Sequence, residues 1–271
     1  MTDYTDPKVV DGLENSTDAI AARLSAIKLP REWSTTCFSP STNRVQFANY
    51  ARDKAGSVTI EDVKIEQRIG SDSRNAVVYE GDVKGRRVAV KCMPLVFGNS
   101  WDDEVRIAQL LSNRALQDLG KPFPIVVGSG KTIIELPPEF GNSLAAWQET
   151  ARINAVKGGS NRRQSLRIMQ AQKDRIDNVY ARYLISELAA SDLQSVRDPS
   201  MYRDQMECAL RELHSAGYAH GDAHLGNFLL TPDDEVLIHD FGNAIENASE
   251  IQFADDFAKL DEALLLHTPP S

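Results

Sequence analysis

The sequence lacks the features that mark membrane and secreted proteins. Its 271 residues contain no run of 18 apolar residues, so we expect no membrane span and no membrane partner. The start, Met1–Tyr4, is polar and acidic, which argues against a signal peptide.

Cysteine is scarce as well. The three cysteines, Cys37, Cys92 and Cys208, are far apart and odd in number. This pattern favours free thiols in a reducing compartment over a disulfide framework or a zinc site. No cysteine-centred motif surrounds any of them, which argues against a catalytic cysteine. We therefore predict an intracellular, cytoplasmic location.

Positive charge is in deficit, because the formal net charge at pH 7 is −9. Such a balance argues against nucleic acid as a partner. Basic residues gather in one stretch, residues 141–182, whereas residues 231–271 are strongly acidic. The basic stretch is the candidate for docking a regulatory partner, and a solvated helical insertion is the plainer interpretation.

Residues 1–57 are interpreted as a helical N-terminal extension. One helix is expected from about residue 16 to residue 28, where Pro30 stops it. A second is expected from Ser41 as N-cap to Gly56 as C-cap. Neither helix carries a chemical motif.

From Val58 the pattern changes to short strands that are rich in β-branched residues and punctuated by glycines. It predicts an antiparallel meander with strands at residues 58–60, 63–65, 76–79 and 87–91. A helix is expected from about residue 102 to residue 119. Further strands are expected as a pair at 125–127 and 132–135, and at 183–186, with a basic insertion at 137–180 before the last of these.

The last third of the chain predicts two helices. The first runs from about Pro199 to Ala216, with Gly217 as its C′ residue. Its inward residues are expected to be Tyr202, Met206, Ala209, Leu210 and Leu213. Helical spacing predicts a final amphipathic helix that carries Phe253, Phe257, Leu260 and Leu264.

A lysine and a glutamate are placed as phosphate-binding chemistry requires. Lys91 ends the apolar strand 87–91, and Glu104 follows in the first turn of the next helix. A strand lysine held by a helix glutamate can bind the α- and β-phosphates of a nucleotide. Taken alone the pair is weak support, because many surface strands end in lysine.

Two further motifs follow each other across a short hairpin. Residues 220–227 have the form His-x-Asp-x-x-x-x-Asn, in which Asp222 can orient a hydroxyl and Asn227 can ligate Mg²⁺. Asp240 opens Asp-Phe-Gly after an apolar strand and supplies a hard oxygen ligand for Mg²⁺. Together these motifs predict magnesium-assisted phosphoryl transfer.

With these motifs in this order, residues 58 to about 266 resemble the protein-kinase-like superfamily in an atypical, minimal branch. The resemblance implies an α+β, two-lobed fold for residues 58–271. It implies an antiparallel-sheet N-lobe at 58–188, which holds the insertion 137–180, and a truncated helical C-lobe at 189–271. Mg·ATP is expected between the lobes.

The resemblance also implies roles for individual residues. The catalytic residues would be Asp222, Lys91 and His224, and the metal ligands would be Asn227 and Asp240. The residues implied to bind the nucleotide are Ile69, Gly70, Asn75, Val78, Ala89, Lys91, Glu104, Glu187, Leu188 and Leu229.

The catalytic loop departs from ordinary protein kinases. It reads His-Gly-Asp-Ala-His, and its Gly221 and His224 resemble the aminoglycoside and choline phosphotransferases and the RIO group of small kinases. His224 stands where many protein kinases place a lysine near the γ-phosphate. The alternative is a purely structural role for His224.

The phosphate loop departs too, since it keeps only its first glycine, Gly70. Asn75 tolerates a left-handed backbone and can replace a later glycine. Asp72 would repel phosphate if its carboxylate pointed inward.

The segment after Gly242 has no Ala-Pro-Glu motif, and its 29 residues leave no room for the usual peptide-substrate platform. Either Asp255 or Asp256 could anchor the backbone of the catalytic loop. The alternative is a solvated acidic face of the final helix.

We therefore expect an ATP-dependent phosphotransferase that uses Mg²⁺, with the hydroxyl of a serine or threonine in a protein substrate as the first choice of acceptor. A small-molecule phosphotransferase is one alternative, supported by His-Gly-Asp-x-His. A pseudokinase scaffold is another, supported by Asp72 and by the missing platform.

Overall fold

The computed structural model divides the chain into an N-terminal unit, Met1–Thr35, and a compact unit, Thr36–Ser271. It describes residues 37–54, 56–69, 76–94, 101–135 and 178–267. All of these lie in the second unit. The helix expected at 16–28 and nearly all of the insertion 137–180 lie outside the described residues.

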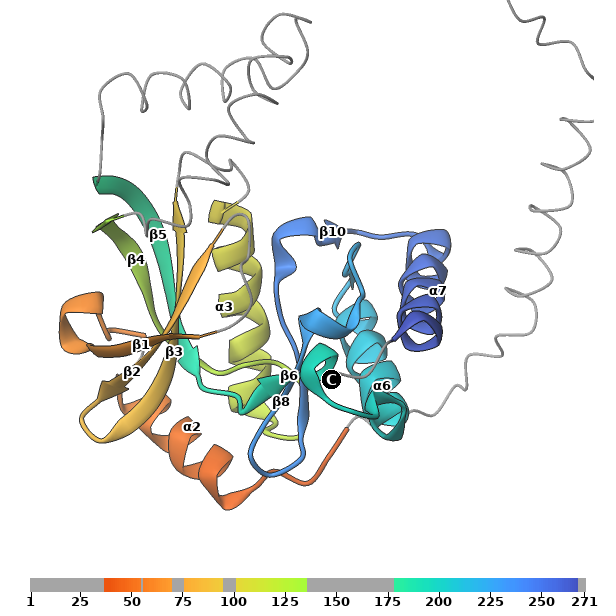
Figure 1. Ribbon diagram of the computed structural model, residues 1–271, viewed down its shortest axis with the longest axis horizontal. Coiled ribbons are helices and arrows are strands. Elements are labelled where there is room, and N and C mark those ends of the chain that lie inside the picture. Colours follow the sequence, from red (N-terminus) through yellow and green to blue (C-terminus); the bar gives the residue numbers. More distant parts are fainter. Residues whose placement is uncertain (1–36, 55, 70–75, 95–100, 136–177, 268–271) are drawn as a thin grey trace, which may run out of the picture. The chain divides into compact units, whose positions relative to one another are not determined.

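The first lobe is built on a five-stranded sheet whose strands follow the order β1-β2-β3-β5-β4 (Figure 1). Every neighbouring pair is antiparallel, which confirms the predicted meander. The strands are β1 (Lys64–Ile69), β2 (Val77–Val83), β3 (Arg86–Pro94), β4 (Val126–Glu135) and β5 (Asn178–Glu187).

Two expected strands are wrong. Residues 58–60 do not form a strand, because Ser57 makes only an isolated bridge to Gly128 and Ile60–Asp62 form the 3₁₀ helix η1. The expected pair at 125–127 and 132–135 is the single strand β4, with an irregularity between Val126 and Gly128. A Cβ at Gly128 would lie 1.9 Å from the carbonyl oxygen of Val58. Glycine at this position therefore permits a close approach of the two backbones.

Two helices of this lobe lie within the described residues. Helix α3 (Trp101–Gln117) buries the face that carries Glu104, Ala108, Leu111 and Ala115, as its periodicity predicted. Helix α2 (Thr42–Lys54) begins where Ser41 Oγ accepts a hydrogen bond from the Arg44 amide at 3.2 Å. It ends before Gly56, whose φ of +75° only glycine adopts readily.

Helix α2 packs into the same core as the sheet. Its residues Phe47, Ala48, Tyr50 and Ala51 are buried in one cluster with Val88, Val90 and Ile185 of the strands. We placed this helix in an extension that ends at residue 57. The compact unit begins at Thr36 instead, so α2 belongs to the kinase-like unit.

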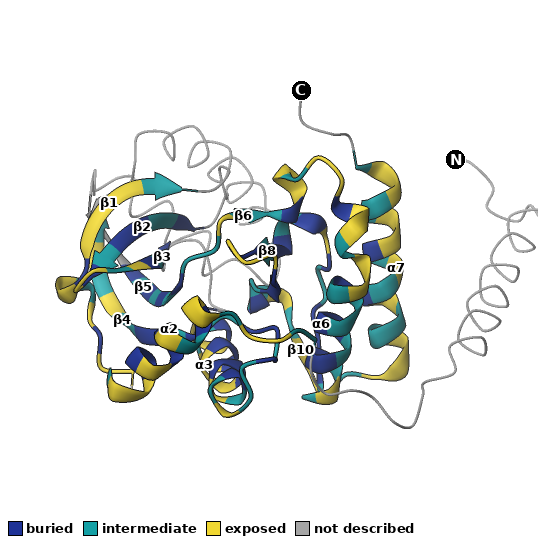
Figure 2. Cartoon of the chain, turned by 90° about the horizontal axis from the view of Figure 1, so that it is seen from below, coloured by how far each residue is buried: buried dark blue, intermediate teal, exposed yellow. Residues whose placement is uncertain are grey.

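The second lobe holds two helices and two small sheets. The 3₁₀ helix η3 (Pro199–Tyr202) leads into α6 (Arg203–Ser215), which ends at Gly217 with φ +87°. Four of the five predicted inward residues are fully buried, and Tyr202 is half-buried. The last helix, α7 (Glu250–Leu266), buries Asp256 and Leu260, and Figure 2 shows most of its other residues exposed or half-buried.

Short segments between these helices carry the chemical motifs. Strands β6 (Ser191–Asp192), β8 (Phe228–Leu230) and β9 (Val236–Ile238) form one sheet, and β7 (Tyr218–Ala219) pairs with β10 (Ile245–Glu246). The 3₁₀ helices are η2 (Leu193–Ser195), η4 (Leu225–Asn227) and η5 (Phe241–Asn243). Within the described part of the chain, no helix is long and apolar enough to cross a bilayer.

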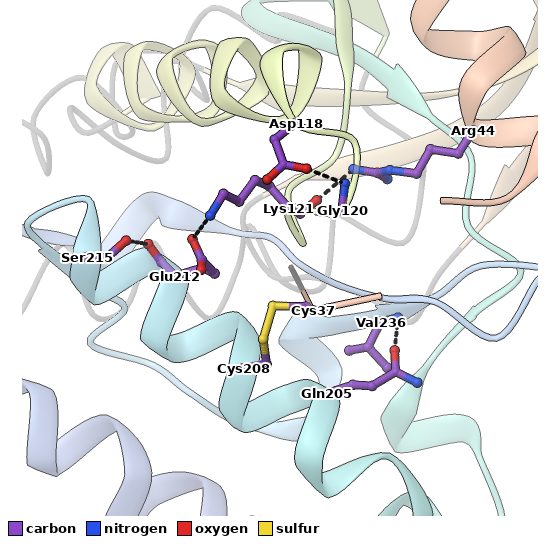
Figure 3. The surroundings of a disulfide bond; sticks show 10 residues. All are labelled: Cys37, Arg44, Asp118, Gly120, Lys121, Gln205, Cys208, Glu212, Ser215 and Val236. Carbon is purple, nitrogen blue, oxygen red and sulfur yellow. Dashed lines mark hydrogen bonds and ion pairs between the residues drawn. A yellow bond between two sulfur atoms is a disulfide. The ribbon is translucent and has the colours of Figure 1, made fainter. Parts of the chain in front are cut away.

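A disulfide joins Cys37 to Cys208, with the sulfurs 2.10 Å apart and a sequence separation of 171 residues. Figure 3 shows it between the segment before α2 and helix α6. The expectation of three free thiols is therefore wrong. The odd number of cysteines misled, because the third, Cys92, is a buried core residue of β3. Burial raises the pKa of the Cys92 thiol to about 12, which makes it unreactive at neutral pH.

We predict that reduction of this disulfide destabilises the protein. A bridge that closes so long a loop contributes roughly 5 kcal/mol by the chain-entropy argument, and its loss should lower the Tm by roughly 10 °C. Differential scanning calorimetry with and without dithiothreitol measures the change. The Cys208→Ser variant should melt at the lower temperature of the reduced protein, and its Tm should not change with dithiothreitol. The Tm of Cys92→Ala should still fall when dithiothreitol is added. Three reactive thiols in the unreduced, denatured wild type would contradict the disulfide.

Candidate functional site

Three predicted site residues meet at one point between the lobes. The Lys91 ammonium of β3 lies 2.5 Å from Glu104 Oε1 of α3 and 3.0 Å from Asp240 Oδ1, which precedes η5. The lysine and the aspartate are 149 positions apart in the sequence. The structure thus brings the expected lysine–glutamate pair together and adds the Asp-Phe-Gly carboxylate to it.

Alternation along β3 explains why Lys91 faces this point. Val88 and Val90 point into the core and are fully buried, whereas Ala89 and Lys91 lie on the opposite, half-exposed face. Val78 pairs directly with Lys91 across β2 and β3, so its side chain lies on that face too. Three residues predicted to bind the nucleotide therefore share one side of the sheet.

Opposite charges keep this cluster ionised. The carboxylates of Glu104 and Asp240 outweigh the effect of burial and raise the pKa of Lys91. Burial alone would raise the pKa of Asp240, but the nearby ammonium holds it well below its usual range. Burial raises the pKa of Glu104, and Lys91 opposes this. Oε2 of Glu104 is buried without a hydrogen-bond partner, and a Cβ at Gly242 would come within 3.2 Å of it.

A buried carboxylate of the last helix binds the main chain of the catalytic loop. Asp256 is fully buried and accepts hydrogen bonds from the amides of His220 at 2.6 Å and Gly221 at 2.8 Å. It also lies 2.9 Å from His214 Nε2. Burial would raise its pKa, but these donors hold it below its ordinary value. Of the two candidates, Asp256 is the anchor, and Asp255 pairs with Lys259 at 2.8 Å.

The backbone conformation and the surroundings of residue 221 require a glycine. Its φ is +77°, and a Cβ would lie 2.4 Å from the carbonyl oxygen of Asn243. Its own carbonyl accepts a hydrogen bond from Lys259 Nζ at 2.7 Å. The glycine that distinguishes this loop from His-Arg-Asp is therefore explained by the close packing of the segment after Asp-Phe-Gly.

Asp222 is the exposed end of this rigid loop. Asn227 Nδ2 donates to its carbonyl oxygen at 2.8 Å, and Asn243 Nδ2 lies 3.3 Å from its Oδ2. His224 Nε2 lies 3.8 Å from the same carboxylate oxygen, while its Nδ1 accepts from the Gly226 amide at 3.1 Å. His224 thus has a structural contact in η4 and also faces Asp222.

The oxygens left open at this point fit Mg²⁺. Asn227 uses its Nδ2 for Asp222, which leaves its Oδ1 as an acceptor, and Asp240 keeps Oδ2 beside the oxygen that Lys91 binds. The amide of His239 donates to the Asn227 carbonyl at 3.1 Å, which fixes the two segments together. Among the described residues, no three His, Cys, Asp or Glu side chains could hold a metal by themselves. Such a site suits Mg²⁺ that is shared with phosphate oxygens.

One predicted contact needs correction. The Glu187 carboxylate does not face the nucleotide, because it is buried against Arg44 Nη1 at 2.6 Å and the Ile125 amide at 2.8 Å. Ile69 ends β1, and Leu188 follows β5. Leu229 of β8 is half-buried between two buried neighbours. Gly70 and Asn75 lie outside the described residues.

The roles of two histidines, the fully buried His220 and the half-buried His239, were not predicted from the sequence. His220 Nε2 donates to the His239 carbonyl at 2.8 Å, and His239 Nε2 donates to the Gly226 carbonyl at 3.1 Å. Burial lowers the pKa of both and brings that of His239 to about 4. Neutral, they tie the catalytic loop to the Asp-Phe-Gly strand. Their positions beside Asp222 and Asp240 were the only signal for this role.

Comparisons with known proteins agree with this geometry. Residues 182–265 match the family model described as the ABC1 atypical kinase-like domain. The chain has a protein-kinase-like fold of the atypical branch.

The kinase-like chain also resembles curated proteins. It is 34% identical over 70 residues to Protein ACTIVITY OF BC1 COMPLEX KINASE 3, chloroplastic, of Arabidopsis thaliana, which covers 26% of the chain and 10% of that protein. It is 26% identical over 174 residues to mitogen-activated protein kinase mpkA from two strains of Aspergillus fumigatus, which covers 60% of the chain and 40% of the relative. The chain thus spans less than half the length of these relatives.

We predict that the free energy of unfolding falls as the pH drops from about 6.5 towards 4. In this window His239 is protonated in the unfolded chain. In the folded protein it stays neutral, because its pKa is about 4. Stability should fall by up to about 1.4 kcal/mol per pH unit for such a histidine. Urea titrations between pH 4.5 and 7.5 measure this slope.

The matching variants separate this histidine from others. His239→Gln keeps a donor for the Gly226 carbonyl and should flatten the slope. His267→Gln, which changes a histidine bonded to the Val196 carbonyl outside the site, is the control. An equal slope in His239→Gln and in the wild type would contradict the lowered pKa of His239.

Proposed function

We propose that this protein is an ATP-dependent phosphotransferase that transfers the γ-phosphate to a hydroxyl group, with serine or threonine of a protein as the acceptor. The observation that carries the proposal is the convergence of Lys91, Glu104 and Asp240 beside a loop that presents Asp222 and Asn227. These five residues come from separate elements and supply the cation, the metal ligands and the acceptor carboxylate that phosphoryl transfer requires.

Lys91 would hold the α- and β-phosphates. Its ammonium has three protons, and the carboxylates of Glu104 and Asp240 take two of them. One donor is left for a phosphate oxygen. The two carboxylates also keep the lysine charged, so that the cation is in place before the nucleotide arrives.

Asn227 and Asp240 would hold Mg²⁺, which neutralises charge on the transferred phosphoryl group when it is bound. Asp222 would orient the acceptor hydroxyl. Its Oδ2 faces Asn243 and His224, whereas Oδ1 has no partner among the described residues and can accept from a hydroxyl. His224 would then lie beside the acceptor.

A small-molecule acceptor is the second candidate. The approach of His224 to Asp222 within 3.8 Å favours it, because the His-Gly-Asp-x-His order resembles the aminoglycoside and choline phosphotransferases. A docking role for the insertion 137–180 stays a prediction. So does a cytoplasmic location, which has lost the support of free thiols now that Cys37 and Cys208 are bonded.

We predict that Asp222→Asn lowers kcat by about 10²- to 10⁴-fold, because a positioned base contributes that much. The affinity for Mg·ATP should stay within about threefold. Transfer from labelled ATP to generic protein acceptors and to aminoglycosides, with autophosphorylation measured in parallel, identifies the acceptor class as well. Asp261→Asn changes a surface carboxylate of α7 that pairs with Arg203 and should have no effect. Unchanged transfer by Asp222→Asn would refute the assigned role.

We also predict that Mg·ATP raises the melting temperature. A ligand that binds only the folded state at 100 times its Kd stabilises it by about 2.7 kcal/mol. The shift should require Mg²⁺. Asp240→Asn removes a proposed metal ligand, so this variant should lose most of the shift, and the remainder should not depend on Mg²⁺. The absence of any shift at millimolar Mg·ATP would instead support a pseudokinase scaffold.

A further inference from the structure

A continuous segment connects the two lobes on the side where β5 leads into the second lobe. We call residues 37–54 the strap; it consists of a short extended stretch and helix α2. Its first residue is bonded to Cys208 of α6, and the Ser41 amide donates to Glu235 Oε1 at 2.5 Å. Its helix is buried against the sheet of the first lobe, and Figure 1 shows this path from one lobe to the other. The strap is thus anchored at both ends.

Arg44 is the most heavily bonded residue of the strap. It is 2% exposed, and its guanidinium donates to the carbonyls of Leu119 at 3.0 Å, Lys121 at 2.9 Å and Phe123 at 2.8 Å. These carbonyls belong to the connection between α3 and β4, towards which Arg44 points in Figure 3. The remaining donor, Nη1, binds the carboxylate of Glu187 at 2.6 Å.

Glu187 ends β5, directly before the crossing to the second lobe. Its Oε1 accepts from the Ile125 amide at 2.8 Å, and its own amide donates to the Ile125 carbonyl at 3.0 Å. The main chain and the side chain of Glu187 are therefore both clamped to one residue. The carboxylate is buried, and Arg44 is the cation that compensates it. Without this partner the buried charge would be strongly unfavourable, and the clamp would loosen.

This clamp bears on the nucleotide site. Under the proposed function, the adenine ring lies against residues 187–188 and is read by their main-chain groups, because the side chain of Glu187 is engaged elsewhere. Main-chain recognition depends on where the backbone is held. The strap holds it through one buried ion pair, although no strap residue is expected to touch the nucleotide.

We propose that Arg44 is a positioning residue for the adenine end of the nucleotide site, acting through Glu187. This inference rests on the proposed function. It assigns the strap a role in nucleotide recognition: α2 is the element that sets the segment joining the lobes. Selectivity for adenine over guanine is the property that this placement should control, because the two bases offer opposite donors and acceptors to the same main-chain groups.

The Arg44→Lys variant tests the proposal with little change of charge. Lysine still compensates Glu187 but cannot reach the three carbonyls as a planar fork. We expect the Kd for ATP to rise about tenfold, the preference for ATP over GTP to fall by a similar factor, and kcat at saturating ATP to change less than threefold. Isothermal titration and steady-state kinetics measure these quantities.

Arg52→Lys is the matched control. Arg52 lies on the same helix and donates to a carbonyl at the end of α3, that of Leu116, but on the surface. It should leave affinity and base selectivity unchanged. Equal values for Arg44→Lys and Arg52→Lys, in a wild type that binds ATP, would overturn the positioning role and leave the proposed function intact.

Amide hydrogen exchange without nucleotide separates a local effect from general unfolding. Arg44→Lys should speed exchange at Ile125 and Glu187 and leave α6 unchanged, and uniformly faster exchange would overturn the proposal. If Arg44→Lys does not fold, Cys37→Ser loosens the strap without touching the buried pair. It should weaken ATP binding a few-fold, and no change would again count against the strap. A wild type that binds neither ATP nor GTP overturns the proposed function itself.

Discussion

One ammonium group held between two carboxylates organises the site. Lys91 reaches Glu104 from the sheet and Asp240 from the second lobe, so a single cation joins β3, α3 and the Asp-Phe-Gly segment. Three charges can share a half-buried point only when their signs alternate, because burial penalises each of them alone. Any large displacement of α3 or of Asp240 would leave one of these charges without its partner. The relative position of the groups proposed to bind phosphate and Mg²⁺ depends on this cluster.

The catalytic loop is rigid for a different reason. The buried carboxylate of Asp256 accepts hydrogen bonds from two main-chain amides of the loop, and Lys259 binds the Gly221 carbonyl. The backbone carbonyl of Asn243 leaves no space for a side chain at Gly221. These contacts fix the loop, so that the Asp222 carboxylate projects from a supported main chain. Pre-organisation of this kind is what a positioned catalytic group needs.

The strap is held to the second lobe by a covalent bond and to the first lobe by an ion pair. The Cys37–Cys208 disulfide ties its start to α6, and the Arg44–Glu187 pair ties its helix to the end of β5. A third link, Lys121 with Glu212 at 2.6 Å, joins the connection before β4 to α6 (Figure 3). All three lie on the side of the connection between α3 and β4. These three links restrain the lobes on that side. None of them contacts the Lys91 cluster or the catalytic loop.

Local sequence patterns predicted much of the fold and of the candidate site. The apolar run before Lys91 predicted the strand that carries it, although β3 continues to Pro94, and helical periodicity placed Glu104 on the buried side of α3. The order and spacing of the motifs identified Asp222, Asn227 and Asp240 as neighbours. Local rules failed where a distant backbone decided the outcome. The two strands expected at 125–127 and 132–135 are one strand, in which Gly128 permits the close approach of Val58.

What the sequence by itself determined is the set of chemical groups and the elements that carry them, because periodicity and turn chemistry act over a few residues. Tertiary structure decided which of the two acids in α7 anchors the catalytic loop, since only Asp256 faces the amides of His220 and Gly221. It also decided that Cys37 meets Cys208 and that the carboxylate of Glu187 binds Arg44. These pairings join residues more than 30 positions apart, and no local preference of the chain encodes a distance across the folded molecule.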